Sequence, residues 1–181
     1  MGMSLAVVSY PAISPEDGLW LDALRYRFPD LAYPRLPPHV TLVFPTMTVD
    51  AATLIHYMHE VVQNFEPINF MIRCALYMPD ALGNNTHVFL VPDEGFSAIV
   101  RLHDQLYRGL LAPALRLDIP FIPHITVGYS ADAAYCKSAV DAINAENREI
   151  SGTLSVLQVL AVSEDGIQSI ERLRLNVKHK K

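Results

Sequence analysis

The sequence predicts an α+β fold made of largely antiparallel sheets, with helices packed outside them. Segments typical of strands and segments with helical spacing follow one another in the order β-α-β-α-β-β-α-β-α-β-β. At least two strand pairs are joined directly, as antiparallel hairpins are, which argues against a purely parallel sheet. A short motif that occurs once in each half of the chain further suggests two related lobes.

Five elements are expected in the first half of the chain. Residues 4–10 are rich in Leu, Val and Ala, as a buried strand is. A hydroxyl cap, a proline and two acids begin a helix over 14–28. Residues 39–44 form a strand after two prolines, and an aspartate caps a helix over 50–65 with apolar residues at helical spacing. Residues 68–78 form the next strand.

The second half repeats this alternation and closes with a hairpin. Asn84 and Asn85 mark a turn, after which the chain returns as a strand. The expected elements are a strand over 86–91, a helix from Asp93 to about 110, a strand over 121–129, a helix over 131–147, and strands over 153–162 and 167–175. The closing turn is centred on Asp165.

Length and composition indicate one domain with ample core. The chain has 181 residues, of which 51% are hydrophobic. It contains no apolar run of the roughly 20 residues that a membrane-spanning helix needs. Cys74 and Cys136 lie too far apart in sequence to suggest a metal pair, so both are expected as small core residues in a reduced, cytoplasmic protein. We expect a monomer that needs no cofactor and no metal.

The net charge argues against a long nucleic-acid partner. Proteins that grip many phosphates usually present a basic face, whereas this chain carries a formal charge of −5. Its one basic cluster is the terminal run 178–181, which we expect to be frayed. A small anionic ligand that needs only a local site remains compatible with this charge.

The repeated motif is a His-x-Thr triplet. Pro38-His39-Val40-Thr41-Leu42 matches Pro123-His124-Ile125-Thr126-Val127 at three of five positions, and both remaining positions are apolar. Residues two apart on a strand point to the same face. His39 should therefore share a face with Thr41, opposite Val40, Leu42 and Phe44. Likewise, His124 should share a face with Thr126 and Gly128, opposite Tyr129.

These residue types suit phosphoester chemistry without a metal. An imidazole titrates near pH 6.5, so one histidine can remove a proton from the attacking oxygen while another protonates the leaving oxygen. Threonine hydroxyls can donate hydrogen bonds to the non-bridging phosphate oxygens. No carboxylate cluster of the kind that Mg²⁺ or Mn²⁺ prefers is apparent near either triplet. We therefore expect His39 and His124 to be catalytic and Thr41 and Thr126 to bind phosphate.

The two triplets resemble the paired motifs of the two-histidine (2H) phosphoesterase superfamily, which includes 2′-5′ RNA ligase-like proteins and cyclic phosphodiesterases. The resemblance extends over nearly the whole chain and implies a single bilobal domain over 1–181, in which each lobe contributes one His-x-Thr strand to a central cleft. It implies a cyclic phosphodiesterase that acts on a 2′,3′-cyclic or related phosphodiester of a small nucleotide. By the same analogy His124 is the base and His39 the acid, although the reverse assignment is open.

Two other functions remain open. The same fold could ligate or process RNA ends, but several ligase-like members have a basic residue where this chain has Ile122, which favours a smaller substrate. The chain could also be a non-catalytic binder of a phosphorylated ligand. No role in catalysis or metal binding is expected for the remaining histidines. His56 and His59 are expected on a solvated helix face, and His87 and His103 at structural or surface positions.

Overall fold

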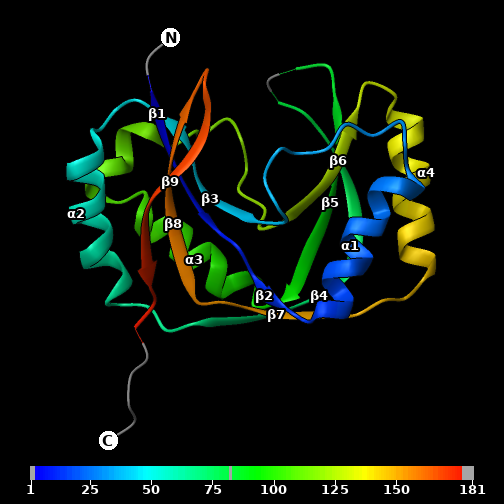
Figure 1. The fold of residues 1–181 in the computed structure, drawn as a ribbon, viewed down its shortest axis with the longest axis horizontal. Helices are drawn as coiled ribbons and strands as arrows, with labels where there is room; N and C mark the ends of the chain where they lie inside the picture. Colours follow the sequence, from blue (N-terminus) through cyan, green and yellow to red (C-terminus); the bar gives the residue numbers. More distant parts are fainter. Residues whose placement is uncertain (1–2, 82, 177–181) are drawn as a thin grey trace, which may run out of the picture.

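A computed structural model describes residues 3–81 and 83–176, and it has the predicted α+β architecture (Figure 1). The predicted basic run 178–181 lies outside the described residues. The strands, in chain order, are β1 (Ser4–Ser9), β2 (Ala12–Ile13), β3 (Val40–Thr46), β4 (Ile68–Pro79), β5 (Thr86–Glu94), β6 (Ile125–Ser130), β7 (Ile150–Leu154), β8 (Val156–Ser163) and β9 (Gly166–Arg174). The helices are α1 (Pro15–Arg27), α2 (Ala51–Val62), α3 (Phe96–Leu106), α4 (Ala133–Ala145) and a short 3₁₀ turn, η1 (Gly109–Ala114).

The strands form two sheets, and all named strand pairs are antiparallel. One sheet has the order β3-β1-β8-β9 and the other the order β2-β7-β4-β5-β6. Helix α2 packs on the four-stranded sheet, α1 and α4 pack on the five-stranded sheet, and α3 contacts β3 of the first sheet and β4 and β5 of the second. Figure 1 shows α2 on the outer side of the four-stranded sheet and α1 and α4 on the outer side of the five-stranded sheet, with β3 and β6 facing the space between the sheets.

The helix starts follow the sequence because their caps are local. Ser14 Oγ accepts a hydrogen bond from Asp17 N at 3.0 Å, and Asp50 Oδ1 accepts one from Thr53 N at 3.0 Å. Each side chain satisfies one of the amide groups that the first helical turn leaves without a partner. The prediction of Asp93 as a helix start is wrong. Strand β5 continues through Glu94, and α3 begins after Gly95, whose φ of +79° ends the strand.

The expected strand over 153–162 is in fact two strands in different sheets. β7 pairs with β4 and β2, whereas β8 pairs with β1 and β9. Ser155 separates them, and its carbonyl accepts a hydrogen bond from Leu175 N at 2.9 Å. The exchange of sheets is a tertiary event, so a continuous apolar run gives no sign of it. The closing hairpin of β8 and β9 is confirmed, whereas β2 and η1 were not predicted.

Irregular strand pairing turns several side chains to faces that simple alternation does not predict. Cys136 is fully buried as expected, but Cys74 is exposed, next to a break in the β4–β5 register. In β3, the pairing with β1 skips Leu42, and in β6 the pairing with β5 skips Val127. Both skipped residues are the third after a motif histidine. The two copies of the motif are therefore alike in backbone irregularity as well as in sequence.

Candidate active site

Both motif histidines lie immediately before a strand, not within one. β3 begins at Val40, one residue after the expected start at His39, and β6 begins at Ile125, four residues after the expected start at Phe121. β3 is an edge strand of the four-stranded sheet and β6 an edge strand of the five-stranded sheet. Each sheet thus supplies one histidine, which immediately precedes an edge strand.

The two imidazoles are oriented in the same way by the backbone. His39 Nδ1 lies 2.8 Å from the carbonyl oxygen of Pro37, and His124 Nδ1 lies 2.6 Å from that of Ile122. A carbonyl oxygen only accepts hydrogen bonds, so both Nδ1 atoms carry the proton. In the neutral imidazole this leaves Nε2 as the free lone pair. Both histidines therefore present the same nitrogen, Nε2, for chemistry.

A cavity of about 800 Å³ lies between the two sheets, and three of the four predicted site residues line it. Thr41 comes from β3, while His124 and Thr126 come from the start of β6. His39 is not among the lining side chains; it is half-buried, with its ring 6.0 Å from that of Tyr10. The full lining is Thr41, Phe44, Pro45, Thr46, Met47, Thr48, Met78, Pro79, Asp80, Ala81, His87, Phe89, Ala114, Arg116, Ile119, Pro120, Phe121, Ile122, His124 and Thr126.

The strand irregularities decide which neighbours reach this cavity. Phe44 was expected opposite Thr41, yet both line the cavity because the skipped residue in β3 reverses the alternation. Gly128 was expected on the ligand side with His124. A Cβ atom at Gly128 would instead lie 2.8 Å from the carbonyl oxygen of Ala32, so this glycine makes room for backbone and not for a ligand.

Burial makes both histidines poor proton binders in the free protein. It lowers the pKa of His124 to about 4, a shift to which the nearby His87 and His39 add by charge repulsion and which the Ile122 carbonyl partly offsets. Burial also lowers the pKa of His39, against an opposing effect of the Pro37 carbonyl. The repulsion from His39 is the smallest of these effects on His124. His124 is neutral at neutral pH, which suits a base.

The low pKa of His124 has a measurable consequence for stability. Between about pH 6.5 and pH 4 the unfolded chain binds a proton at His124 that the folded chain does not, so the free energy of unfolding falls as the pH falls. We expect NMR titration to show His124 neutral down to about pH 4. In His124→Gln, acid-induced destabilisation should shrink by about 3 kcal/mol at pH 4. An ordinary His124 titration near pH 6.5 would contradict the buried state described here.

Phe89 packs directly against the His124 ring. The two ring centroids are 3.6 Å apart and the planes differ by 18°, so the phenyl ring stacks on the imidazole. Phe89 lies on β5 directly opposite Thr126, the second residue after His124. The stack removes water from one face of the imidazole and limits its rotation. The sequence places Phe89 on the strand expected over 86–91, but it does not show that this strand pairs with the strand of Thr126. The contact between Phe89 and His124 therefore could not be predicted.

Two further residues of the cavity were missed. His87 was assigned a structural or surface role, but it lines the cavity, with Nε2 3.7 Å from Asp80 Oδ2 and its ring 5.4 Å from that of Phe89. Arg116 also lines the cavity, with its guanidinium bonded to both carboxylate oxygens of Asp118 at 2.8 and 2.5 Å. Its loop follows η1, which the sequence did not predict.

His56, His59 and His103 have the surface and structural positions predicted for them. His56 and His59 are exposed on α2, and His56 Nε2 lies 3.7 Å from the carboxylate of Glu60. His103 is buried on α3, where its ring stacks on Phe121 at 3.7 Å. Within residues 3–81 and 83–176, no group of three or more His, Cys, Asp or Glu side chains is placed to hold a metal ion. No helix in the same ranges is long and apolar enough to cross a membrane.

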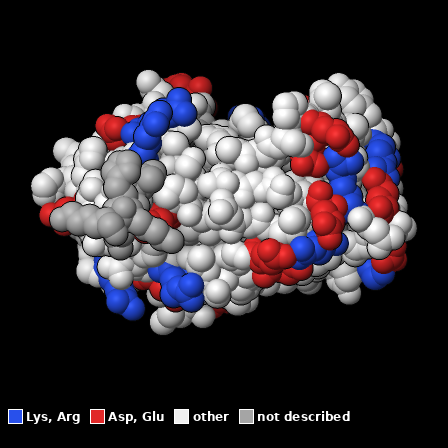
Figure 2. Space-filling model, turned by 90° about the horizontal axis from the view of Figure 1, so that it is seen from below, with Lys and Arg blue, Asp and Glu red and all other residues white. Residues whose placement is uncertain are grey.

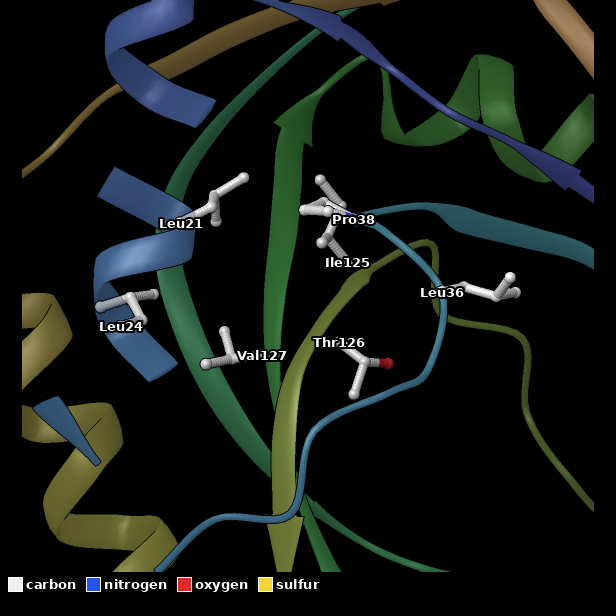
Figure 3. Close-up of a pocket in the computed structure, with 7 residues that line it drawn as sticks. All are labelled: Leu21, Leu24, Leu36, Pro38, Ile125, Thr126 and Val127. Atoms are coloured by element: carbon white, nitrogen blue, oxygen red, sulfur yellow. The ribbon is translucent and has the colours of Figure 1, made fainter. Parts of the chain in front are cut away.

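A second, much smaller cavity of about 20 Å³ lies where the two motifs meet (Figure 3). Figure 3 shows Leu21 and Leu24 of α1 beside Val127 of β6, with Pro38 close to Ile125. A space of this size holds about one water molecule, so it is a packing gap and not a ligand site. The chain that leads to His39 therefore packs directly on the strand that carries Thr126.

Gly128 allows the chain after α1 to pack closely on β6. Ala32 pairs with Tyr129 through two backbone hydrogen bonds of 2.8 and 2.9 Å, next to Gly128. A Cβ atom at position 128 would meet Ala32 O at 2.8 Å and Leu31 Cβ at 3.0 Å. We expect Gly128→Ala to destabilise the protein by about 1–3 kcal/mol in urea unfolding, because rigid backbone must move. Gly18→Ala is the control, since nothing lies within 4 Å of its Cβ position; equal stability of the two variants would contradict this role.

Charges on the surface do not form a continuous basic track on the face seen in Figure 2. Lys and Arg side chains lie next to Asp and Glu on the side of α1 and α4, and the middle of this face carries few charges. Individual described arginines are also paired: Arg73 with Asp93, Glu94 and Glu149, and Arg148 with Glu16 and Asp17. Positive charge on this face is thus confined to separate patches and forms no continuous track for a nucleic-acid backbone.

Comparison with known proteins agrees with this architecture. A protein of Geobacillus thermodenitrificans, named as a candidate phosphoesterase, is 22% identical over 167 residues, 91% of each chain. LigT of E. coli complexed with 3′-AMP superposes with a TM-score of 0.62 at 15% identity, over 97% of this chain and 99% of LigT. TT0787 of Thermus thermophilus gives a TM-score of 0.62 at 16% identity, over 97% and 100% of the two chains. The model of the 2′-5′ RNA ligase superfamily matches residues 12–166, and the chain belongs to this superfamily.

Proposed function

We propose that this protein is a metal-independent cyclic phosphodiesterase that hydrolyses a 2′,3′-cyclic or related nucleotide phosphodiester. One observation carries the proposal: both motif imidazoles donate Nδ1–H to the carbonyl two residues earlier, which leaves two equivalent Nε2 atoms for acid–base work. The chain 1–181 would act as one bilobal unit, with a histidine and a threonine from each sheet. Candidate phosphoesterases among the relatives, and LigT structures with 3′-AMP, ATP and NADP⁺, are in keeping with a nucleotide substrate.

In this mechanism His124 is the base. Its Nε2 takes a proton from water as the water oxygen attacks phosphorus, and its low pKa keeps it ready for that role. His39 is the acid: protonated at Nε2, it gives its proton to the leaving ribose oxygen as the P–O3′ bond breaks. The bound phosphodiester anion favours protonation of His39, which offsets the effect of burial. The product is a 2′-phosphate with a free 3′-hydroxyl.

Thr41 and Thr126 would hold the phosphoryl group between the two histidines. Their hydroxyls can donate hydrogen bonds to the non-bridging oxygens, on which charge increases in the transition state. Both threonines line the same cavity although they come from different sheets. The threonines would thus complete a pseudo-symmetric cradle in which each sheet supplies one proton-transfer group and one hydrogen-bond donor.

The direct test is hydrolysis of nucleoside 2′,3′-cyclic phosphates with EDTA present. We expect turnover that EDTA does not reduce and a product with its phosphate on the 2′ oxygen, identified by ³¹P NMR. Turnover that stops in EDTA and returns with added Mg²⁺ or Mn²⁺ would contradict the metal-independent mechanism. Binding without turnover across the four common nucleosides would favour the non-catalytic alternative.

RNA ends are the second candidate substrate, favoured by the superfamily to which the chain belongs. An oligonucleotide ending in a 2′,3′-cyclic phosphate tests it directly. If RNA is the substrate, affinity should fall steeply with salt, because each neutralised phosphate releases counterions. The pairing of described arginines with carboxylates argues for the smaller substrate, for which salt dependence should be shallow.

A further inference from the structure

The wall of the large cavity beyond the His-x-Thr residues is mainly apolar. Three segments supply it: the end of β3 with the residues after it, the end of β4 with the residues after it, and the chain between η1 and His124. Its apolar side chains include Phe44, Met47, Met78 and Phe121. Phe44 is 38% exposed and Met47 is 71% exposed, so these two side chains are not buried in the core and can contact a ligand. Apolar walls with a few polar groups are typical of sites for small, largely uncharged ligand parts.

The ring of Phe121 and the backbone of Phe44 are held in place from behind this wall. The ring of Phe121 stacks on the buried His103 of α3, with a centroid distance of 3.7 Å and an angle of 8° between the planes. The backbone N–H of Phe44 donates to Tyr107 Oη at 3.0 Å, and Tyr107 is itself buried beside His103. Because stacking on His103 fixes the orientation of the Phe121 ring, its other face can stack on a flat ligand at little entropic cost.

The cavity has very little positive charge with which to bind a second anion. Among the described residues that line it, Arg116 is the only Lys or Arg, and Asp118 engages its guanidinium through two hydrogen bonds. Asp80 is the only Asp or Glu among the same residues, and it lies near His87. A phosphate placed away from the two motifs would lose its hydration without gaining a free cation.

We propose that the site selects phosphodiesters that carry one negative charge and one uncharged aromatic group, and that it rejects a second phosphate. The substrate class is thus a nucleoside 2′,3′-cyclic phosphate with a free 5′-hydroxyl, and neither a 5′-phosphorylated nucleotide nor an RNA end. This inference rests on the proposed phosphodiesterase function for the position of the reacting phosphate. It goes beyond that function by naming what the rest of the substrate must be.

Binding of product-like ligands tests the inference without relying on turnover. In calorimetry, adenosine 2′-phosphate should bind more tightly than adenosine 2′,5′-bisphosphate and more tightly than ribose 2-phosphate. Its Kd should be lower by about tenfold in each comparison. Equal or tighter binding of the bisphosphate would overturn the rejection of a second charge. Equal binding of ribose 2-phosphate would overturn the aromatic requirement. If this ranking holds but no cyclic phosphate is hydrolysed, only the catalytic proposal fails.

Variants locate the aromatic contact. Phe121→Leu should weaken the binding of adenosine 2′-phosphate by about tenfold and leave the binding of ribose 2-phosphate unchanged, because only the stacking partner of the base is lost. Leu117→Ala is the matched control, since Leu117 lies in the same loop but is 89% exposed and does not line the cavity. Circular dichroism and thermal unfolding show whether each variant is folded. Phe44→Leu is a second variant that tests the same cavity wall independently. Loss of affinity for both ligands to the same extent in both Phe variants would contradict a role in stacking.

Discussion

His124→Ala and His39→Ala should each lower kcat for a nucleoside 2′,3′-cyclic phosphate by about 10²–10⁴-fold, because each removes one proton-transfer group. KM should change much less, since the threonines and the cavity wall remain. The measurement is steady-state hydrolysis in EDTA. His56→Ala is the control, because this histidine is 82% exposed on α2 and does not line the large cavity. Near-normal kcat in either motif variant would rule out the two-histidine mechanism.

The same variants separate the acid from the base. A 4-nitrophenyl phosphodiester has a leaving group that needs no proton, so loss of the acid should matter little for it. We therefore expect His39→Ala to recover most of its activity with this substrate, whereas His124→Ala stays impaired. The reverse pattern would exchange the two roles. The loss of kcat in the variant that lacks both histidines should be well below the product of the two single losses, because the two groups act in one step.

Thr126→Val should lower kcat by about 10²–10³-fold, as loss of one donor to a developing oxyanion does in other enzymes. Valine keeps the shape and the strand preference of threonine but lacks the hydroxyl, so the fold should be retained. Thr41→Val should have an effect of similar size if the cradle is pseudo-symmetric. Both effects should appear in kcat more than in KM, because the charge on the non-bridging oxygens rises in the transition state.

Thr153→Val is the matched control for these two variants. Its hydroxyl donates to Asn69 Oδ1 at 2.8 Å on the five-stranded sheet, and the residue does not line the large cavity. We expect it to change kcat by less than about twofold, as surface substitutions usually do. A comparable loss in Thr153→Val would indicate a general effect on folding and would remove the support for phosphate binding by Thr126.

Features controlled by neighbouring residues could be predicted from the sequence. The caps Ser14 and Asp50 lie where expected because a cap depends only on the next three residues. The motif histidines were found because the two copies match, and the structure extends this match to the hydrogen bonds of both Nδ1 atoms. The two motif strands start later than expected, at Val40 and Ile125, because the two histidines use side-chain contacts to the preceding carbonyls, while ladder pairing begins only at the next residue.

The sequence by itself determined the α+β class, the order of most elements and the identity of the paired His-x-Thr motifs, since these depend on periodicity and short-range hydrogen bonds. Only the tertiary structure decided that Ser155 separates strands of two sheets and that skipped residues turn Phe44 towards the cavity. It also brought Phe89 onto the ring of His124. These features depend on strand pairing between segments far apart in the chain, and no local pattern encodes which strand becomes the neighbour of another.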